Sequence, residues 1–452
     1  MTIRVVDAPR PGHDRSSDGR PFSVVDELNC YLDSPAEPNN VQLEVWLPGH
    51  LSPERLRAAV AAALADVPAA RARRAAGTWW RAGYAWEFPP EADANPVSVT
   101  GWRTEAELGA ARTRFLAAAP DLDRSPPFRL LLAQGPGWDS LILNAHHAAF
   151  DGRSCVRLLR LIAARYSGGQ RREALAQERG SVARPRSGSP AIAPRTVSGS
   201  RRSGLPLPSL NTARIASEHA DRRAARGAPG YGLRLLEWPG VPAAPPPQSR
   251  VTVNDLLIAA LIETITRWNT ARRRRTGRIR ISMPVDTRLA GRGDELGNLS
   301  RLCTVTVDPS RVADLTLAVA GQTRQAKSRP GPLVGPAQAA VARTRLPAGV
   351  KRGLLRLALR SVGTIRCDTS LLSNLGNITD PPKFETLTPT RMWFSTSAHM
   401  PRGLSVGAVT VGGRLSLCFR YRNALLDAAS GRDFAAEYAA ALSALAGEGT
   451  GR

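Results

Sequence analysis

The chain has 452 residues, 42% of them hydrophobic and 22% charged, a composition typical of a folded protein with two or three cores. No apolar run reaches the roughly 18 residues that a membrane-spanning helix needs, and the polar N-terminus lacks the apolar segment of a signal peptide. We therefore expect a cytoplasmic protein with no membrane partner.

The net charge of +24 comes almost entirely from arginine, because lysine occurs only at Lys327, Lys351 and Lys383. The densest arginine clusters, at 272–275 and 171–202, are not interleaved with the aromatic side chains that bind single-stranded nucleic acid. The charge therefore does not predict a nucleic-acid partner. Most of it is expected to be solvated surface, with a field that attracts an acidic protein or a phosphate-bearing molecule.

The five cysteines are dispersed, and no two have the C-x-x-C spacing typical of zinc and redox sites. In a cytosolic protein such scattered thiols do not predict disulfides either. We therefore expect no bound metal, and a structural role for each of Cys30, Cys155, Cys303, Cys367 and Cys418.

The first half of the chain is predicted to alternate between strands and helices after a disordered tail at 1–20. Residues 42–47 alternate between apolar and polar side chains with the period of a strand. Ser52 and Pro53 then supply an N-cap and a first helical residue for a helix in the alanine-rich stretch that follows. A second helix is expected at 105–118.

Two short buried strands are predicted at 128–133 and 140–145, separated by a Gly-Pro-Gly turn. After Gly152 the apolar residues recur with the spacing of an amphipathic helix. They are Val156, Leu159, Ile162, Ala163 and Tyr166.

Between 176 and 209 the composition changes to Gly, Ser, Pro and Arg, which cannot build a core. We expect a basic flexible linker there. The second half then begins with a helix capped by Asn254 or Asp255, followed by a strand at 278–284. The outline is two α/β halves joined by one linker.

The most informative segment is HHAAFDG, residues 146–152, which follows the predicted strand at 140–145 and precedes a predicted helix. Adjacent side chains of an extended segment point to opposite sides, and no nearby residue completes a ligand set, so the pattern does not indicate a metal site. A histidine that only packs in the core would explain one of the pair, but not the pair together with Asp151 and Gly152.

This segment resembles the HHxxxDG motif of the condensation-domain superfamily. That superfamily includes nonribosomal peptide condensation domains, chloramphenicol acetyltransferase-like enzymes, and polyketide-associated and wax-ester acyltransferases. Further segments resemble superfamily sequences in the same order, from about residue 21 onwards. They are 22–26, 121–129, 253–255, 282–288, 296–298 and 373–376.

The resemblance implies an α/β fold made of two chloramphenicol acetyltransferase-like subdomains. They would form a pseudo-dimer with a tunnel at their junction. On this basis we expect an N-terminal subdomain at 21–175 and a C-terminal subdomain at 210–452.

The resemblance also implies roles for the residues of the motif. His147 would be the general base that takes a proton from an attacking amine or hydroxyl, a task that suits a side chain with a pKa near neutrality. His146 would pack beneath the site, and Asp151 would point away from the base to form a structural ion pair with Arg288. Gly152 would let the start of the helix approach the site, where its N–H groups and dipole stabilise an oxyanion.

Four more polar residues are candidates for the tunnel wall. Ser373 and Asn374 belong to the segment SLLSNLGN, for which a simple turn is the alternative explanation. Asn298 is a weaker candidate of the same kind. His399 would either face the tunnel or lie in the core or on the surface.

The implied activity is transfer of an acyl or aminoacyl group from a phosphopantetheine thioester to an amine or hydroxyl of a small-molecule acceptor. Nonribosomal peptide synthesis and antibiotic biosynthesis in bacteria are the expected context. No adenylation or carrier segment is recognisable, so we expect a freestanding monomer that binds no permanent cofactor and is served by an acyl or peptidyl carrier protein.

Three alternatives stay open at this point. The first is an ester-forming O-acyltransferase that uses acyl-coenzyme A. The second is a catalytically inactive binding protein of the same fold. The third, which rests on charge alone, is a nucleic-acid binder.

Overall fold

The computed structural model describes residues 19–77, 81–168, 212–217, 230–238, 240–242, 251–288, 296–328, 344–361 and 368–448. The predicted linker at 176–209 lies outside the described residues, as does nearly all of the predicted tail at 1–20. No helix within the described ranges is both long enough and apolar enough to cross a membrane.

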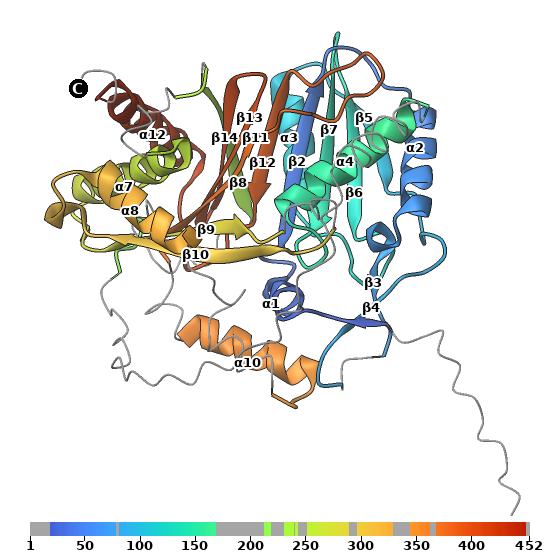
Figure 1. Ribbon diagram of the computed structural model, residues 1–452, viewed down its shortest axis with the longest axis horizontal. Helices are drawn as coiled ribbons and strands as arrows, with labels where there is room; N and C mark the ends of the chain where they lie inside the picture. The colour runs from blue at the N-terminus through green and yellow to red at the C-terminus, as the bar shows by residue number, and fades with distance from the viewer. Residues whose placement is uncertain are drawn as a thin grey trace, which may run out of the picture.

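One sheet belongs mainly to the N-terminal half and has the strand order β12-β2-β7-β6-β5. Its strands are β2 (Asn40–Leu47), β5 (Val97–Gly101), β6 (Phe128–Gln134), β7 (Asp139–His146) and β12 (Arg391–Thr396). Helices α2 (Pro53–Asp66) and α4 (Gly152–Tyr166) pack on one face. Helix α3 (Glu105–Leu116) packs on the other (Figure 1).

The second large sheet has the order β10-β9-β11-β13-β14-β8 and belongs to the C-terminal half. Its strands are β8 (Tyr231–Trp238), β9 (Ile279–Asp286), β10 (Ser300–Val307), β11 (Ser370–Asn377), β13 (Leu404–Val411) and β14 (Arg414–Arg422). Helices α7 (Val253–Ala271), α8 (Leu315–Ser328) and α12 (Ala428–Glu448) complete its core. The two large sheets, each with its helices, stand side by side in Figure 1.

Smaller elements lie around these two halves. They are β1 (Arg20–Pro21), β3 (Arg73–Arg74), β4 (Ala85–Glu87), α1 (Val24–Leu32), α10 (Ala348–Ser361) and the 3-10 turns η1 (Pro68–Arg71) and η3 (Pro309–Arg311). Strands β1, β4 and β3 form a small sheet of their own. Helix α10 packs against α1 below the junction of the halves (Figure 1).

Local sequence signals predicted most of the first half. The strands at 42–47, 128–133 and 140–145 and the helices that begin near Pro53, Glu105 and Gly152 are all present, and Ser52 accepts a hydrogen bond from the backbone of Arg55 as an N-cap. The cap of α7 was predicted wrongly. Thr252 is the N-cap, and Asp255 is the third helical residue of a reciprocal capping box.

Strand β12 connects the two halves. It pairs with β2, with Phe394 opposite Leu43, and it also lies against β13 and β14. Gly407 on β13 makes this approach possible, because a Cβ there would come within 1.9 Å of the carbonyl oxygen of Phe394. A division of the chain at 209 therefore does not separate the two sheets, since β12 comes from the second half of the sequence and completes the sheet of the first.

A buried ion pair fixes α3 on the N-terminal sheet. Glu44 on β2 is fully buried, and its carboxylate accepts hydrogen bonds from Arg112 Nε at 2.6 Å and Nη2 at 2.7 Å. Gln42, Trp46 and Ser140 also donate to it, at 2.8–3.1 Å. Although burial alone would raise the pKa of Glu44, the attraction of Arg112 and these donors holds it below its usual value of 4.5.

We predict that Arg112→Met lowers the free energy of unfolding by about 3–5 kcal/mol, because Glu44 would remain as a buried carboxylate without its cation. The double variant Glu44→Gln/Arg112→Met should recover part of this loss, and Arg114→Met on the exposed face of α3 should change little. Since the folded-state pKa of Glu44 is depressed, the contribution is present above the unfolded value near 4.5 and is lost as the pH falls below it. Urea unfolding at pH 7 and pH 4 measures both effects, and strictly additive single losses would contradict the coupling.

Candidate active site

The HHAAFDG segment forms a tight connection between β7 and α4. His146 is the last residue of β7, and α4 begins at Gly152. Within the connection, the N–H groups of Ala149 and Phe150 donate to the carbonyl oxygen of His146 at 3.0 and 3.2 Å. The N–H of His147 donates to the carbonyl oxygen of Asn39 at 2.9 Å, so this histidine is tied to the start of β2.

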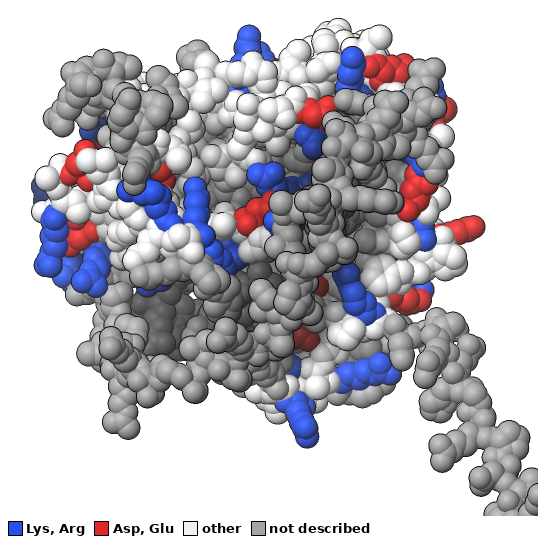
Figure 2. Space-filling model, viewed as in Figure 1, with Lys and Arg blue, Asp and Glu red and all other residues white. Residues whose placement is uncertain are grey.

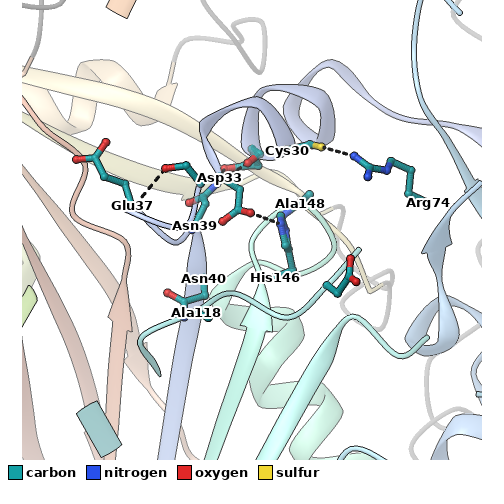
Figure 3. A network of polar contacts seen from close by, with 12 residues as sticks. Cys30, Asp33, Glu37, Asn39, Asn40, Arg74, Ala118, His146 and Ala148 are labelled. Carbon is teal, nitrogen blue, oxygen red and sulfur yellow. Dashed lines mark hydrogen bonds and ion pairs between the residues drawn. The ribbon is translucent and has the colours of Figure 1, made fainter. Parts of the chain in front are cut away.

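The two histidines have different surroundings. His146 is buried, and its Nδ1 accepts a hydrogen bond from the N–H of Ala148 at 3.0 Å. Its Nε2 therefore carries the ring proton and faces the Asp33 carboxylate at 3.7 Å (Figure 3). The ring of His146 thus stabilises the connection from below, while Asp33 also accepts from the N–H of Asn39 at 2.8 Å.

His147 faces a cavity instead of a structural partner. Its Nδ1 is buried and makes no hydrogen bond to any described residue. Burial lowers the pKa of His147, while its own backbone carbonyl, Asp151 and Asn298 oppose the shift. The ring is therefore neutral at physiological pH, the form in which a histidine accepts a proton.

Asn298 anchors the connection from the C-terminal half. Its Nδ2 donates to the carbonyl oxygens of His147 and Ala148, both at 2.7 Å, and lies 3.3 Å from Asp26 Oδ1. The side chain was expected on the tunnel wall. It does line the cavity, but its hydrogen bonds hold the backbone carbonyl groups of His147 and the residue after it.

Asp151 connects α4 to the C-terminal half. Its carboxylate caps α4 by accepting from the N–H of Ser154 at 2.8 Å. It also lies 2.9 Å from Arg288 Nη2 and accepts from the N–H of Leu299 at 3.0 Å. The side chains of Asp151 and Arg288 are only 5% and 4% exposed, so the ion pair is buried. Desolvation opposes the charge of Arg288, but the hydrogen bond and attraction of Asp151 raise the pKa of the guanidinium above its usual value.

Gly152 is required by the packing at the start of α4. A Cβ on this residue would lie 2.7 Å from Leu375 Cδ2 and 2.7 Å from Phe394 Cε2. Leu375 belongs to β11 and Phe394 to β12, so the glycine lets the N-terminus of the helix approach strands from both large sheets. Any larger residue would push α4 away from the junction.

The cavity beside His147 has a volume of about 530 Å³ and is lined by residues from both halves. Helix α1 contributes Val25, Leu28, Asn29 and Leu32 to one wall. The sequence candidates that line it are His147, Asp151, Gly152, Asn298, Ser373, Asn374 and His399. His146 is absent from this wall, in keeping with its position beneath the connection.

Three functional positions were missed by the sequence interpretation. Asn39 contacts both the backbone of His147 and the side chain of His399, Asp33 faces His146, and Arg402 lines the cavity. Asn39 and Asp33 stand in the turn between α1 and β2, where no periodic pattern marks them. Only their spatial proximity to the motif identifies them.

We predict that Asp151→Asn and Arg288→Met each lower the free energy of unfolding by about 3–5 kcal/mol, because either change leaves a buried charge without its partner. The double variant should lose less than the sum of the two. Arg267→Met, which breaks the exposed pair of Arg267 with Glu263, serves as control and should cost at most about 0.5 kcal/mol. Thermal and urea unfolding measure these differences, and additive losses from the two buried sites would contradict the pairing.

Comparison with known proteins identifies two similar sequences and many similar folds. No protein-family model matches the chain. Two uncharacterised proteins of Mycobacterium tuberculosis, MT2362 of strain CDC 1551 and Rv2305 of strain H37Rv, are each 32% identical over 427 residues, which is 88% of this chain and 93% of theirs.

Solved structures with the same fold include two condensation domains and SgcC5. The condensation domain of the monacolin K polyketide synthase MokA aligns with a TM-score of 0.58 and 14% identity over 94% of this chain and 97% of its own. The starter condensation domain of rhizomide synthetase RzmA, in complex with C8-CoA and Leu-SNAC, gives 0.60 and 12% over 96% of each chain. SgcC5 of Streptomyces globisporus gives 0.59 and 16% over 94% of this chain and 98% of its own.

These similarities cover almost the whole chain, which confirms the fold that the HHAAFDG segment and its collinear partners predicted. The chain belongs to the same family as the two Mycobacterium tuberculosis proteins, and its fold is that of the condensation-domain and chloramphenicol acetyltransferase-like superfamily.

Proposed function

We propose that the protein is an acyltransferase that moves an acyl or aminoacyl group from a phosphopantetheine thioester to an amine or hydroxyl of a small acceptor. The observation that carries this proposal is the position of His147: a neutral, half-buried histidine on the wall of a cavity between the two halves. Its Nδ1 lacks a hydrogen-bond partner among the described residues, and desolvation outweighs the attraction of Asp151, so the neutral ring is favoured.

In the proposed reaction the acceptor's nucleophilic atom attacks the thioester carbonyl, and His147 takes the proton that this atom loses. The tetrahedral intermediate then collapses, the C–S bond breaks, and the imidazolium returns the proton to the departing thiolate. The products are an amide or ester and a free thiol, so His147 ends as it began. A positioned base of this kind contributes roughly 10²–10⁴-fold to the rate.

The residues around His147 act in this scheme by positioning its ring and the reacting groups. His146, Asn39 and Asn298 hold the backbone around His147 through the hydrogen bonds described above. Gly152 and Asp151 bring the N-terminus of α4 to the cavity, where its dipole favours the negative oxygen of the intermediate. Ser373 and Asn374, which line the same cavity from β11, are the proposed contacts to the substrate.

Two of the solved structures support this assignment of substrates. The RzmA starter domain binds C8-CoA together with the thioester Leu-SNAC, and the SgcC5 structure contains a diol and sucrose. By analogy, we propose a thioester donor and an acceptor with an amine or hydroxyl for this protein, in the assembly of a nonribosomal peptide, polyketide or related natural product.

We further propose that a carrier protein is the usual donor of the acyl group. Arginine and lysine side chains are spread over the face shown in Figure 2, interspersed with acidic residues. Arg153 and Arg280 line the cavity and are 54% and 32% exposed in their side chains. Such charges suit the docking of an acidic carrier and of the phosphate on its pantetheine arm.

We predict that His147→Ala lowers kcat/KM by at least about 10²-fold without changing the melting temperature, because the variant loses the base but no structural partner. His146→Ala should lower stability as well as rate. For the wild type, burial lowers the pKa of His147, so the acid limb of the kcat/KM profile should lie below the ordinary histidine value of 6.5. A His147→Ala enzyme with more than a tenth of the wild-type rate would contradict the proposal that His147 is the general base.

We predict that the same acyl group is transferred with a higher kcat/KM from its cognate carrier protein than from coenzyme A. Reversing the charge of Arg153 or Arg280 should raise the KM for the carrier-bound donor more than it lowers kcat, because remote charges contribute mainly uniform binding. Intact-mass analysis of the carrier and quantification of released thiol measure the rates of acyl transfer from the two donors. Equal efficiency with coenzyme A would favour the acyl-coenzyme A-dependent, ester- or amide-forming alternative.

A further inference from the structure

The loop between β12 and β13 brings an arginine to the cavity wall. Residues 397–403 form this loop, and Ser397, His399 and Arg402 all line the cavity that contains His147. The Nε of Arg402 is buried, and Arg402 makes no hydrogen bond or ion pair with any described residue. A buried N–H without an acceptor is costly unless a ligand or water satisfies it.

A second arginine near this loop, Arg420, also has no ion-pair partner among the described residues. Arg420 is fully buried, with its guanidinium carbon 4.4 Å from the centre of the Tyr231 ring and its Nη1 donating to the carbonyl oxygen of Asn40 at 3.5 Å. Burial lowers the pKa of Arg420. Like Arg402, Arg420 forms no ion pair with a described carboxylate.

Glu37 is the carboxylate near this loop, and it is already engaged. It accepts from the N–H of Met400 at 2.9 Å, lies 3.8 Å from Arg422 Nε, and lies 3.9 Å from His399 Nδ1. It does not line the cavity. Glu37 thus interacts with Arg422, and it forms no ion pair with Arg402 or Arg420.

A short chain of contacts joins this loop to the base. The backbone carbonyl of Asn39 accepts from the N–H of His147 at 2.9 Å. The side-chain Oδ1 of the same residue accepts from Ser397 Oγ at 2.7 Å and lies 3.2 Å from His399 Nε2. Asn39 therefore contacts both the loop and His147, which is the proposed reacting centre.

We infer that Arg402 forms a subsite for a carboxylate carried by the acceptor, which makes the acceptor a free amino acid, hydroxy acid or similar small acid. This inference rests on the proposed acyl transfer and specifies its acceptor. The phosphate of a pantetheine arm is separated from the thioester by the length of the arm, so it cannot lie here while the carbonyl is beside His147. An acceptor tethered to a carrier through its own carboxyl group has no carboxylate to offer.

The first test compares acceptors that differ only in this group. With octanoyl-CoA as donor, kcat/KM is measured for leucine against leucinamide and for 2-hydroxy-4-methylpentanoate against its amide. For whichever pair the wild type turns over, kcat/KM should be at least about 10-fold higher for the acid than for its amide, as expected for one charged hydrogen bond. Arg402→Gln should remove most of this preference through KM, Arg402→Lys should keep part of it, and the exposed Arg103→Gln should keep all of it.

A second test separates failure of this inference from failure of the proposed reaction, because it needs no turnover. Thermal shift with hexanoate and hexanamide is measured on the wild type, His147→Ala, Arg402→Gln and Arg103→Gln. Hexanoate should raise the melting temperature of all of these proteins except Arg402→Gln. Hexanamide should not raise the melting temperature of any of them more than hexanoate does. Hexanoate binding that survives in Arg402→Gln would overturn the subsite, even if the enzyme transfers acyl groups.

A third comparison determines which substrate carries the carboxylate. Succinyl-CoA and butyryl-CoA are offered as donors with a single amide acceptor. The inference predicts no advantage for succinyl-CoA that depends on Arg402. If Arg402→Gln selectively impairs succinyl-CoA, the carboxylate belongs to the acyl chain and the assignment to the acceptor is wrong.

Discussion

The candidate site depends on one buried carboxylate at the junction of the two halves. Asp151 caps the helix that follows the motif and, through the same two oxygens, binds Arg288 and the backbone of Leu299. Because it lies four residues after His147, it fixes the distance between the base and the C-terminal half. Neither half alone provides the cavity, so the site forms only when the halves are docked.

This arrangement gives adjacent histidines opposite properties. His146 ends a strand and is held by the N–H of Ala148 and by Asp33. His147 enters the turn and reaches the cavity, where burial without a structural partner keeps it neutral. The two adjacent side chains therefore lie in different surroundings, one beneath the connection and the other on the cavity wall.

Local signals in the sequence predicted the helices and strands that are marked by a capping residue or by the periodic spacing of their apolar residues. The helix after Ser52 and the strands flanking the Gly-Pro-Gly turn were predicted correctly, whereas the Thr252 cap was missed although the T-x-x-D spacing of a capping box was present. The pairing of β12 with β2 joins residues about 350 positions apart, as in the hydrogen bond between Ser395 and Gln42, and no local pattern encodes such a contact. The same holds for Asn39 and Arg402, which lie in loops and reach the site only through the tertiary fold.

The central claim is that a thioester carbonyl is delivered beside His147, and an affinity label tests it most directly. Bromoacetyl-pantetheine carries an electrophilic carbon next to its thioester carbonyl. It contains neither a carrier protein nor the nucleotide of coenzyme A, so the test does not depend on which of the two is the natural donor. Peptide mapping by mass spectrometry after stoichiometric labelling should find the adduct on His147, with protection by an excess of octanoyl-pantetheine. Burial raises the pKa of the nearby Cys155 thiol, so this cysteine should not compete. Labelling confined to other residues, with His147 unmodified, would contradict the account.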